Sequence, residues 1–127
     1  MNSLLAVAAG GAVGASARYL FNLQALRLLG PNFPWGTFGV NIIGSLLMGL
    51  LAGALALKYD LSPEMRSFLA TGVLGGFTTF SAFSLDAANM IERGDMGLAG
   101  LYMAGSVAGA VGALFLGLWL ARALFSA

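Results

Sequence analysis

Residues 72–84 read GVLGGFTTFSAFS, and this is the most informative stretch of the chain. Gly75 and Gly76 are adjacent there, and the β-branched residues Thr78 and Thr79 follow them. Glycine and β-branched residues both disfavour a helix. The stretch lies inside a run, residues 67–85, that contains no charged residue. We therefore expect an apolar helix that is broken near its middle and whose freed backbone carbonyls need a partner.

The overall composition indicates an integral membrane protein. Hydrophobic residues make up 59% of the 127 residues and charged residues only 9%, whereas soluble domains contain about 25% charged residues. The chain has no cysteine and no histidine, which excludes disulfides, thiol catalysis and imidazole bases. A net charge of +1 gives no basic surface for nucleic acid. No pair of buried acid and base residues is visible, so we expect no enzyme.

The charged residues divide the chain into four apolar runs, each long enough to cross a bilayer. We expect a single all-α transmembrane domain over residues 1–127, with helices at about 3–29, 37–57, 64–92 and 97–124. The connections are short, so consecutive helices should be antiparallel neighbours. Ser62 and Pro63 favour a helix start, with serine as the N-cap and proline in the first helical position.

The positive charges leave the orientation in the membrane open. Lys58, Arg66 and Arg122 fall on the N-terminal side, and Arg18, Arg27 and Arg93 fall on the opposite side. Because cytoplasmic loops carry an excess of lysine and arginine, an equal count gives no preferred orientation. Either so few charges make the count uninformative, or the protein inserts in both orientations and pairs head to tail.

Glycines recur at the spacing used for contact between membrane helices. The GxxxG pairs are Gly10 with Gly14, Gly49 with Gly53, Gly72 with Gly76, and Gly105 with Gly109. Such pairs let two helix backbones approach closely, although several would arise by chance among 19 glycines. Four helices enclose little interior, so polar residues within them should need a second subunit. We therefore expect an oligomer.

Three polar side chains lie inside the expected spans and mark candidate sites. Arg18 either extends along the helix to the far interface or lines a water-filled vestibule. Asn41 shares a helix face with Thr37 and is suited to a hydrogen bond between helices. Asp86 either pairs with an arginine near the membrane edge or lies at the interface.

The polar residues of the 72–84 stretch allow two interpretations. Carbonyls freed by a helix break can bind a cation, as they do in broken transporter helices. Phe80 and Phe83 are three residues apart, and the positive edges of their rings could face a small anion. Alternatively, the serines and threonines bond back to carbonyls of their own helix, which would then be only kinked.

The polar segments together resemble the Fluc (CrcB) family of microbial fluoride channels. The matching segments are residues 10–19, 36–44 and 75–84, and the resemblance extends over the whole chain. It implies a fluoride-selective channel that passively exports fluoride from the cytoplasm. It also implies an antiparallel, dual-topology homodimer with two pores, located in the plasma membrane of a microbe, which is the inner membrane in bacteria.

The resemblance further implies roles for particular residues. Asn41, Phe80 and Phe83 would line the fluoride pore, Ser81, Thr37 and Thr79 would lie along the same path, and Arg18 would lie in a vestibule. A structural sodium ion at the centre of the dimer would be held by the backbone carbonyls of Gly75 and Thr78.

This sequence departs from the family pattern at several positions. Ala82 replaces the usual threonine, and Asp86 replaces a frequent glutamate. Ala110 and Leu114 stand where the fourth helix usually carries hydroxyls, with Ser106 one turn earlier. The alternative assignment is a small multidrug-type, proton-coupled cation transporter. That activity needs a carboxylate within the membrane, for which Asp86 is the candidate.

Overall fold

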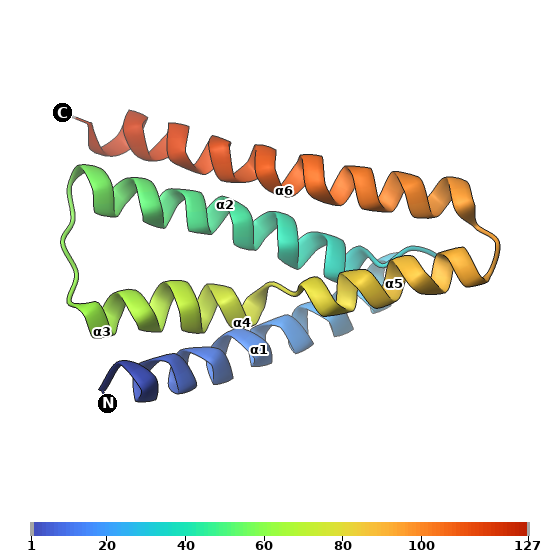
Figure 1. Ribbon diagram of the computed structural model, residues 1–127, viewed down its shortest axis with the longest axis horizontal. Helices are drawn as coiled ribbons and strands as arrows, with labels where there is room; N and C mark the ends of the chain where they lie inside the picture. Colours follow the sequence, from blue (N-terminus) through green and yellow to red (C-terminus); the bar gives the residue numbers. More distant parts are fainter. Residues whose placement is uncertain (1, 127) are drawn as a thin grey trace.

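Residues 2–126 are described by a computed structural model, and within this range all regular structure is helical (Figure 1). The helices are α1 (Asn2–Leu29), α2 (Trp35–Leu57), α3 (Pro63–Arg66), η1 (Ser67–Leu74), α4 (Gly75–Phe77), α5 (Phe80–Glu92) and α6 (Met96–Phe125). The elements from α3 to α5 form one long stretch, Pro63–Glu92, in which η1 has the wider π-helical winding. Four stretches in this part of the chain, α1, α2, Pro63–Glu92 and α6, are long and apolar enough to cross a membrane. The expected all-α architecture with four spans is confirmed.

Short loops with recognisable caps join the helices. The Ser62 side chain accepts a hydrogen bond from the Met65 amide at 3.2 Å, and Pro63 occupies the first turn of α3, as expected. Gly30 follows α1 with φ +80° and Gly94 follows α5 with φ +83°, a conformation that glycine adopts without strain and that commonly ends a helix. Helix α2 begins at Trp35, two residues before the expected start at 37.

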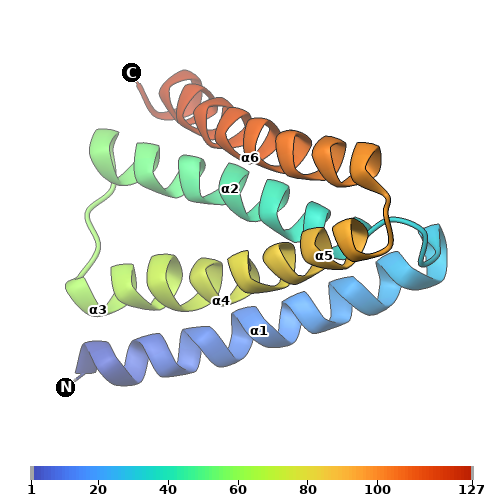
Figure 2. The same ribbon diagram turned by 45° about the vertical axis from the view of Figure 1, so that its right-hand side comes forward.

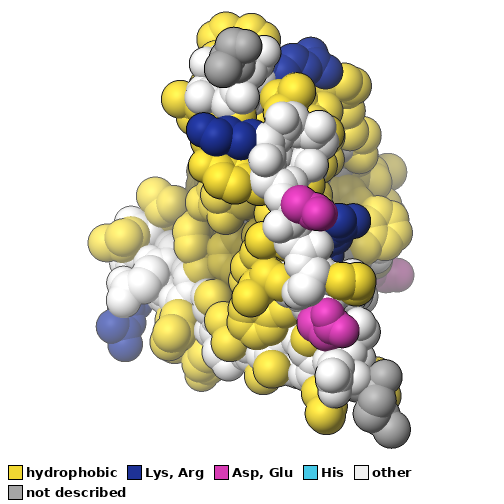
Figure 3. Space-filling model, turned by 90° about the vertical axis from the view of Figure 1, so that its left-hand side faces the viewer, with side chains coloured by type: hydrophobic (Ala, Val, Ile, Leu, Met, Phe, Trp, Pro, Cys, Tyr) yellow, Lys and Arg dark blue, Asp and Glu magenta, His cyan; other side chains and the backbone are white. Residues whose placement is uncertain are grey.

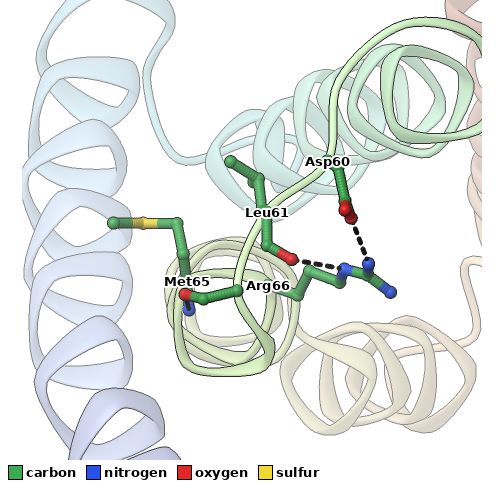
Figure 4. A network of polar contacts seen from close by, with 5 residues as sticks. Asp60, Leu61, Met65 and Arg66 are labelled. Carbon is green, nitrogen blue, oxygen red and sulfur yellow. Dashed lines mark hydrogen bonds and ion pairs between the residues drawn. The ribbon is translucent and has the colours of Figure 1, made fainter.

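The loop between α2 and α3 is tied to the helix that follows it (Figure 4). Arg66 donates a hydrogen bond through Nη2 to the Asp60 carboxylate at 2.8 Å and another through Nε to the Leu61 carbonyl at 3.2 Å. The Arg66 and Asp60 side chains are largely exposed, so this ion pair orders the loop more than it stabilises the fold.

The helices form two parallel pairs. Figures 1 and 2 show α1 alongside α3, η1 and α4, all running in one direction. Helices α2 and α6 lie alongside each other and are also parallel, but both run opposite to the first pair. Consecutive helices are antiparallel, as expected, but the most extensive packing joins alternate helices. The two pairs meet where α5 approaches α2 and α6, and they diverge toward the α2–α3 loop.

Glycines allow the close approach within each pair. A Cβ atom at Gly14 would overlap the Val73 carbonyl in η1, and one at Gly49 would overlap the Leu114 carbonyl in α6. An added Cβ at Gly10 would also meet the Gly72 backbone and the reverse, and one at Gly76 would meet the Gly11 backbone. The Gly105–Gly109 pair makes no such contact: an added Cβ would meet only the side chains of Phe38 and Ile42. Three of the four expected pairs therefore bring helix backbones close together, and the fourth faces side chains of α2.

A small aromatic core lies where the two pairs meet. Buried residues Phe83, Ala87, Met90, Ala99 and Tyr102 form one cluster. The Phe33 ring from the α1–α2 loop packs edge to face on Tyr102, with centroids 5.3 Å apart. Elsewhere large hydrophobic side chains are exposed on every long helix. Viewed from the end that carries the α2–α3 loop, hydrophobic side chains cover most of the surface, and the flank between the pairs is recessed (Figure 3). A single subunit thus leaves much apolar surface for lipid or another protein chain.

Candidate functional site

The third span is interrupted at Thr78 and Thr79. Thr78 has φ −85° and ψ 160°, and Thr79 has φ −153° and ψ 122°, so both have extended backbones between α4 and α5. The break expected within residues 72–84 is therefore present, and it lies at the two threonines, because Gly75 and Gly76 are helical. Gly76 instead packs on α1, where an added Cβ would lie 2.9 Å from the Gly11 carbonyl oxygen. Gly76 thus serves close packing, and the β-branched threonines form the interruption.

Hydrogen bonds of the two threonines end one helix and begin the next. The Thr78 amide and hydroxyl both donate to the Leu74 carbonyl, at 3.1 and 3.0 Å. The Thr79 hydroxyl accepts from the Ala82 amide at 3.1 Å and so caps α5. Ser84 donates to the Phe80 carbonyl at 2.9 Å. The segment is therefore broken and not only kinked, although Thr78 and Ser84 bond back to carbonyls of their own segments as the second interpretation expected.

Asn41 holds the extended segment from the side of α2. Its Nδ2 donates to the Thr79 carbonyl at 3.0 Å, and its Oδ1 accepts from the Thr79 amide at 2.8 Å. The expected hydrogen bond between helices is therefore present, but its partner is backbone. An asparagine amide carries two N–H donors, so one of them remains for a ligand.

Arg18 holds the opposite side of the break, from α1. Its Nε donates to the Gly76 carbonyl at 3.0 Å, and the residue is partly buried. The interpretation that Arg18 extends to the far interface is therefore wrong. The Gly75 and Thr78 carbonyls, in contrast, accept no hydrogen bond from any residue in the range 2–126.

A cavity of about 300 Å³ lies beside the break, between α2, α5 and α6. Four of the candidate pore residues line it, namely Asn41, Thr79, Phe80 and Phe83. The other lining residues are Ser45, Thr78, Ser106, Val107, Ala110 and Val111. The two phenylalanine rings have centroids 5.6 Å apart and are tilted by 38°. Phe83 is 9% exposed, whereas Phe80 is 79% exposed at the mouth of the cavity.

Two hydroxyls in this cavity were not singled out from the sequence as pore residues. Ser106 is 6% exposed and its Oγ has no hydrogen-bond partner within residues 2–126. Ser45 lies one helical turn after Asn41, and Ser106 one turn before Ala110. That four-residue spacing from a candidate on the same helix was the available signal. Leu114 does not line this cavity and instead contributes its carbonyl to the α2–α6 contact.

Thr37 and Ser81 lie outside this cavity. Thr37 is buried and lines a second cavity of about 310 Å³ under the α1–α2 loop. Ser81 is exposed, with its hydroxyl 3.3 Å from that of Thr79. Asp86 also lines the second cavity, and its carboxylate accepts a hydrogen bond from the Tyr102 hydroxyl at 3.1 Å. The hydrogen-bond partner of Asp86 among the described residues is therefore a buried tyrosine on α6 and not the expected arginine.

The family follows from the sequence over most of this structure. Residues 5–118 match the family described as CrcB-like protein, Camphor Resistance (CrcB). The chain belongs to the CrcB-like protein family. The matched region includes the second and third spans, most of the first and fourth, the break and both cavities. The resemblance inferred from the three polar segments is confirmed.

Curated bacterial CrcB relatives match over their full length. A protein of Hyphomonas neptunium is 60% identical over 99% of this chain and 100% of its own. A protein of Phenylobacterium zucineum is 59% identical with the same coverage. One of Agrobacterium fabrum is 54% identical over 98% of this chain and 100% of its own. Each is named "Fluoride-specific ion channel FluC".

Proposed function

We propose that this CrcB protein is a fluoride-specific ion channel. The observation that carries the proposal is the cavity at the helix break, where hydrogen-bond donors and two phenylalanine rings converge in a chain whose relatives bear that name. Conduction makes and breaks no covalent bond, so the protein is not an enzyme. Family membership also favours this function over small multidrug-type transport.

The chemistry of the cavity suits a small, strongly hydrated anion. A pore must replace the water around the ion, yet bind it weakly enough for release. The free N–H of Asn41 and the unpartnered hydroxyl of Ser106 can donate hydrogen bonds to fluoride. Phe80 and Phe83 can present the positive edges of their rings. The positive charge of Arg18 can raise the anion concentration near the pore.

A second, antiparallel copy of the chain would complete the pore wall. The 79% exposed Phe80 lies at the mouth of the cavity, where a second subunit could cover it. Arg18 lies at the break and not in a loop, so Lys58, Arg66 and Arg122 remain at one end and Arg27 and Arg93 at the other. This near balance supports insertion in both orientations. The assembly is then a dual-topology homodimer with two pores.

The residues at the break also fit a structural sodium ion. The carbonyls of Gly75 and Thr78 lack donors within the described chain, and no neighbouring element crowds Gly75. Unwound carbonyls are ligands for sodium in broken membrane helices. When bound, the ion would supply a fixed positive charge near the two pores.

The cellular setting follows from the chemistry of fluoride. The four apolar helices and the bacterial relatives support a multi-pass membrane protein, which we assign to the bacterial inner membrane. Hydrogen fluoride is a weak acid that crosses lipid and dissociates in the cytoplasm. A passive pore for the anion would lower cytoplasmic fluoride.

Fluoride efflux from liposomes tests the function. Purified protein is reconstituted, and halide electrodes follow fluoride and chloride release under a potassium–valinomycin driving force. We expect release of fluoride without chloride, and slower release by Phe80→Ile at equal protein content. Phe115→Ile is the matched control, because Phe115 is also exposed, at 65%, but lies outside the cavity. Release of neither ion from folded protein would refute the channel function.

A further inference from the structure

We propose that Arg18 is a positioning residue for the break in the third span. Its guanidinium holds the carbonyl end of α4 and thereby sets the direction in which the neighbouring Gly75 and Thr78 carbonyls point. The inference rests on the sodium site proposed above and assigns to α1 a role in forming it. It gives Arg18 a function different from that of a charge in a vestibule.

The position of Arg18 follows from the glycine contacts of α1. Gly10, Gly14 and Arg18 are spaced four residues apart and therefore lie on one face of the helix. Gly10 and Gly14 press that face onto the backbone of η1 and α4. The next residue on the face, Arg18, then lies within reach of the Gly76 carbonyl, and its Nε donates to that oxygen at 3.0 Å. The Arg18 side chain is thus bound to the backbone of the third span near the middle of α1.

The bond to Gly76 selects which carbonyls stay free. The Leu74 carbonyl is taken by Thr78, the Gly76 carbonyl by Arg18 and the Thr79 carbonyl by Asn41. The carbonyls of Gly75, Phe77 and Thr78 remain without a donor among the described residues, and two of them, those of Gly75 and Thr78, are the ones proposed to hold sodium. Carbonyls in one helical segment point the same way along its axis, so fixing Gly76 also fixes the peptide group of Gly75. Without Arg18, the last turn of α4 would end on three freed carbonyls with no cap.

Three substitutions test whether Arg18 acts through its hydrogen bond to Gly76 or through its positive charge. In glutamine the side-chain nitrogen is bonded to Cδ, as Nε is in arginine, so Arg18→Gln retains a donor at the same place without the charge. Arg18→Met has similar reach but neither donor nor charge. Arg18→Lys retains the charge but carries its nitrogen one bond further out. Arg27→Met is the control, because Arg27 is an exposed residue in the last turn of α1.

The main readout does not depend on ion flux. Thermal unfolding of the full-length protein in detergent is measured against sodium concentration, with choline chloride keeping the ionic strength constant. We expect Arg18→Met to raise the half-effective sodium concentration by about tenfold, because a hydrogen bond from a charged group is lost. Arg18→Gln should stay within about threefold of the parent, since a neutral donor replaces a charged one. Arg27→Met should not change the value.

Amide hydrogen exchange at residues 78–82 gives a second readout of the same contact. Exchange there should be faster in Arg18→Met than in Arg18→Gln or in the parent. Equal sodium shifts in Arg18→Gln and Arg18→Met, with Arg18→Lys like the parent, would overturn the proposal in favour of a charge effect. If Arg18→Met does not fold, a raised half-effective sodium concentration in Arg18→Lys supports positioning, and parental behaviour contradicts it.

The outcomes also distinguish this inference from the proposed function. If the parent conducts fluoride but Arg18→Met shows neither a sodium shift nor faster exchange, positioning is refuted and the channel stands. If the parent conducts no fluoride but the sodium and exchange responses appear, positioning stands without the channel. If sodium has no effect on the parent, unchanged exchange in Arg18→Met refutes the inference.

Discussion

Single polar side chains around the break differ in whether their hydrogen-bonding groups are already used. Asn41 uses one donor and one acceptor in hydrogen bonds with the Thr79 backbone, and the Thr79 hydroxyl accepts the hydrogen bond that caps α5. Ser106 is buried in the same cavity with its hydroxyl unpaired. A buried polar group without a partner is destabilising, and this hydroxyl is the donor that the proposed channel would offer to fluoride. We therefore expect a substitution at Ser106 to affect conduction but not to lower the stability of the protein.

Replacing Ser106 by alanine should slow conduction without destabilising the protein. The substitution removes an unpaired buried hydroxyl, which costs about 1–3 kcal/mol in other proteins, so the melting temperature should stay equal or rise. Loss of one hydrogen bond from a hydroxyl to the fluoride ion, whose charge strengthens the bond, should lower fluoride flux by about tenfold or more. Ser16→Ala, at an exposed position on α1, should change neither quantity. Parental flux in Ser106→Ala would exclude this hydroxyl from the ion path.

At the scale of the helix element, the third span consists of two helices with separate ends. Thr78 and its bonds to Leu74 end the first, and Thr79 begins the second as the N-cap of α5. This cap differs from a kink, because it satisfies an amide that no helical carbonyl could reach. The break is therefore a built feature whose strength can be measured.

Removing the cap should loosen the start of α5. Thr79→Ala deletes the acceptor for the Ala82 amide, and loss of such a cap typically costs about 0.5–2 kcal/mol. Thr79→Ser keeps the hydroxyl and should restore most of the stability. Thermal unfolding and amide exchange at residues 80–83 measure the difference. Equal stability of the two variants would show that the side-chain cap does not hold α5.

The glycine contacts within the helix pairs give a prediction with a control in the same chain. Gly14→Ala and Gly49→Ala each place a Cβ on a backbone carbonyl of the neighbouring helix, and such overpacking typically costs about 1–3 kcal/mol. Gly97→Ala meets no atom within 4 Å and should be neutral or slightly stabilising, because alanine favours a helix. The melting temperatures of the three variants provide the test. A destabilised Gly97→Ala with an unaffected Gly14→Ala would contradict these contacts.

The elements themselves were largely predictable from sequence, whereas the contacts at the break were not. Uncharged apolar runs and the Ser62–Pro63 start indicate helices through local chemistry alone. The sequence indicated a break in this stretch but could not show that Gly76 packs on α1 and stays helical, while the two threonines are extended. The partners of Asp86 and Arg18 are a tyrosine hydroxyl on α6 and a backbone carbonyl. A search of the sequence for opposite charges finds neither.

At the scale of the whole molecule, the subunit is two parallel helix pairs joined at one end, with few charges at either end. Two of the basic residues lie in ion pairs, Arg66 with Asp60 and Arg93 with Asp95. The remaining bias between the ends is small. Orientation in the membrane should therefore respond to a single charge.

Opposite single substitutions should shift the orientation in opposite directions. Arg27 and Arg122 are exposed in the last turns of α1 and α6, at opposite ends of the molecule. Arg27→Gln should favour the orientation with the α2–α3 loop in the cytoplasm, and Arg122→Gln the reverse, because positive ends stay inside. Reporter fusions active on only one side of the membrane measure the ratio. A parent found in one orientation only, unmoved by either change, would refute dual topology.

The interleaved pairing of the spans also constrains how the protein is made. A ribosome delivers the spans to the membrane in chain order, but α1 packs most closely with the third span and α2 with the fourth. After two spans have been inserted, neither tight contact can exist, and the glycine faces of α1 and α2 remain exposed to lipid. Compaction then comes late in synthesis, in two steps. A chain halted after α2 would expose the surfaces that membrane chaperones and quality-control proteases recognise.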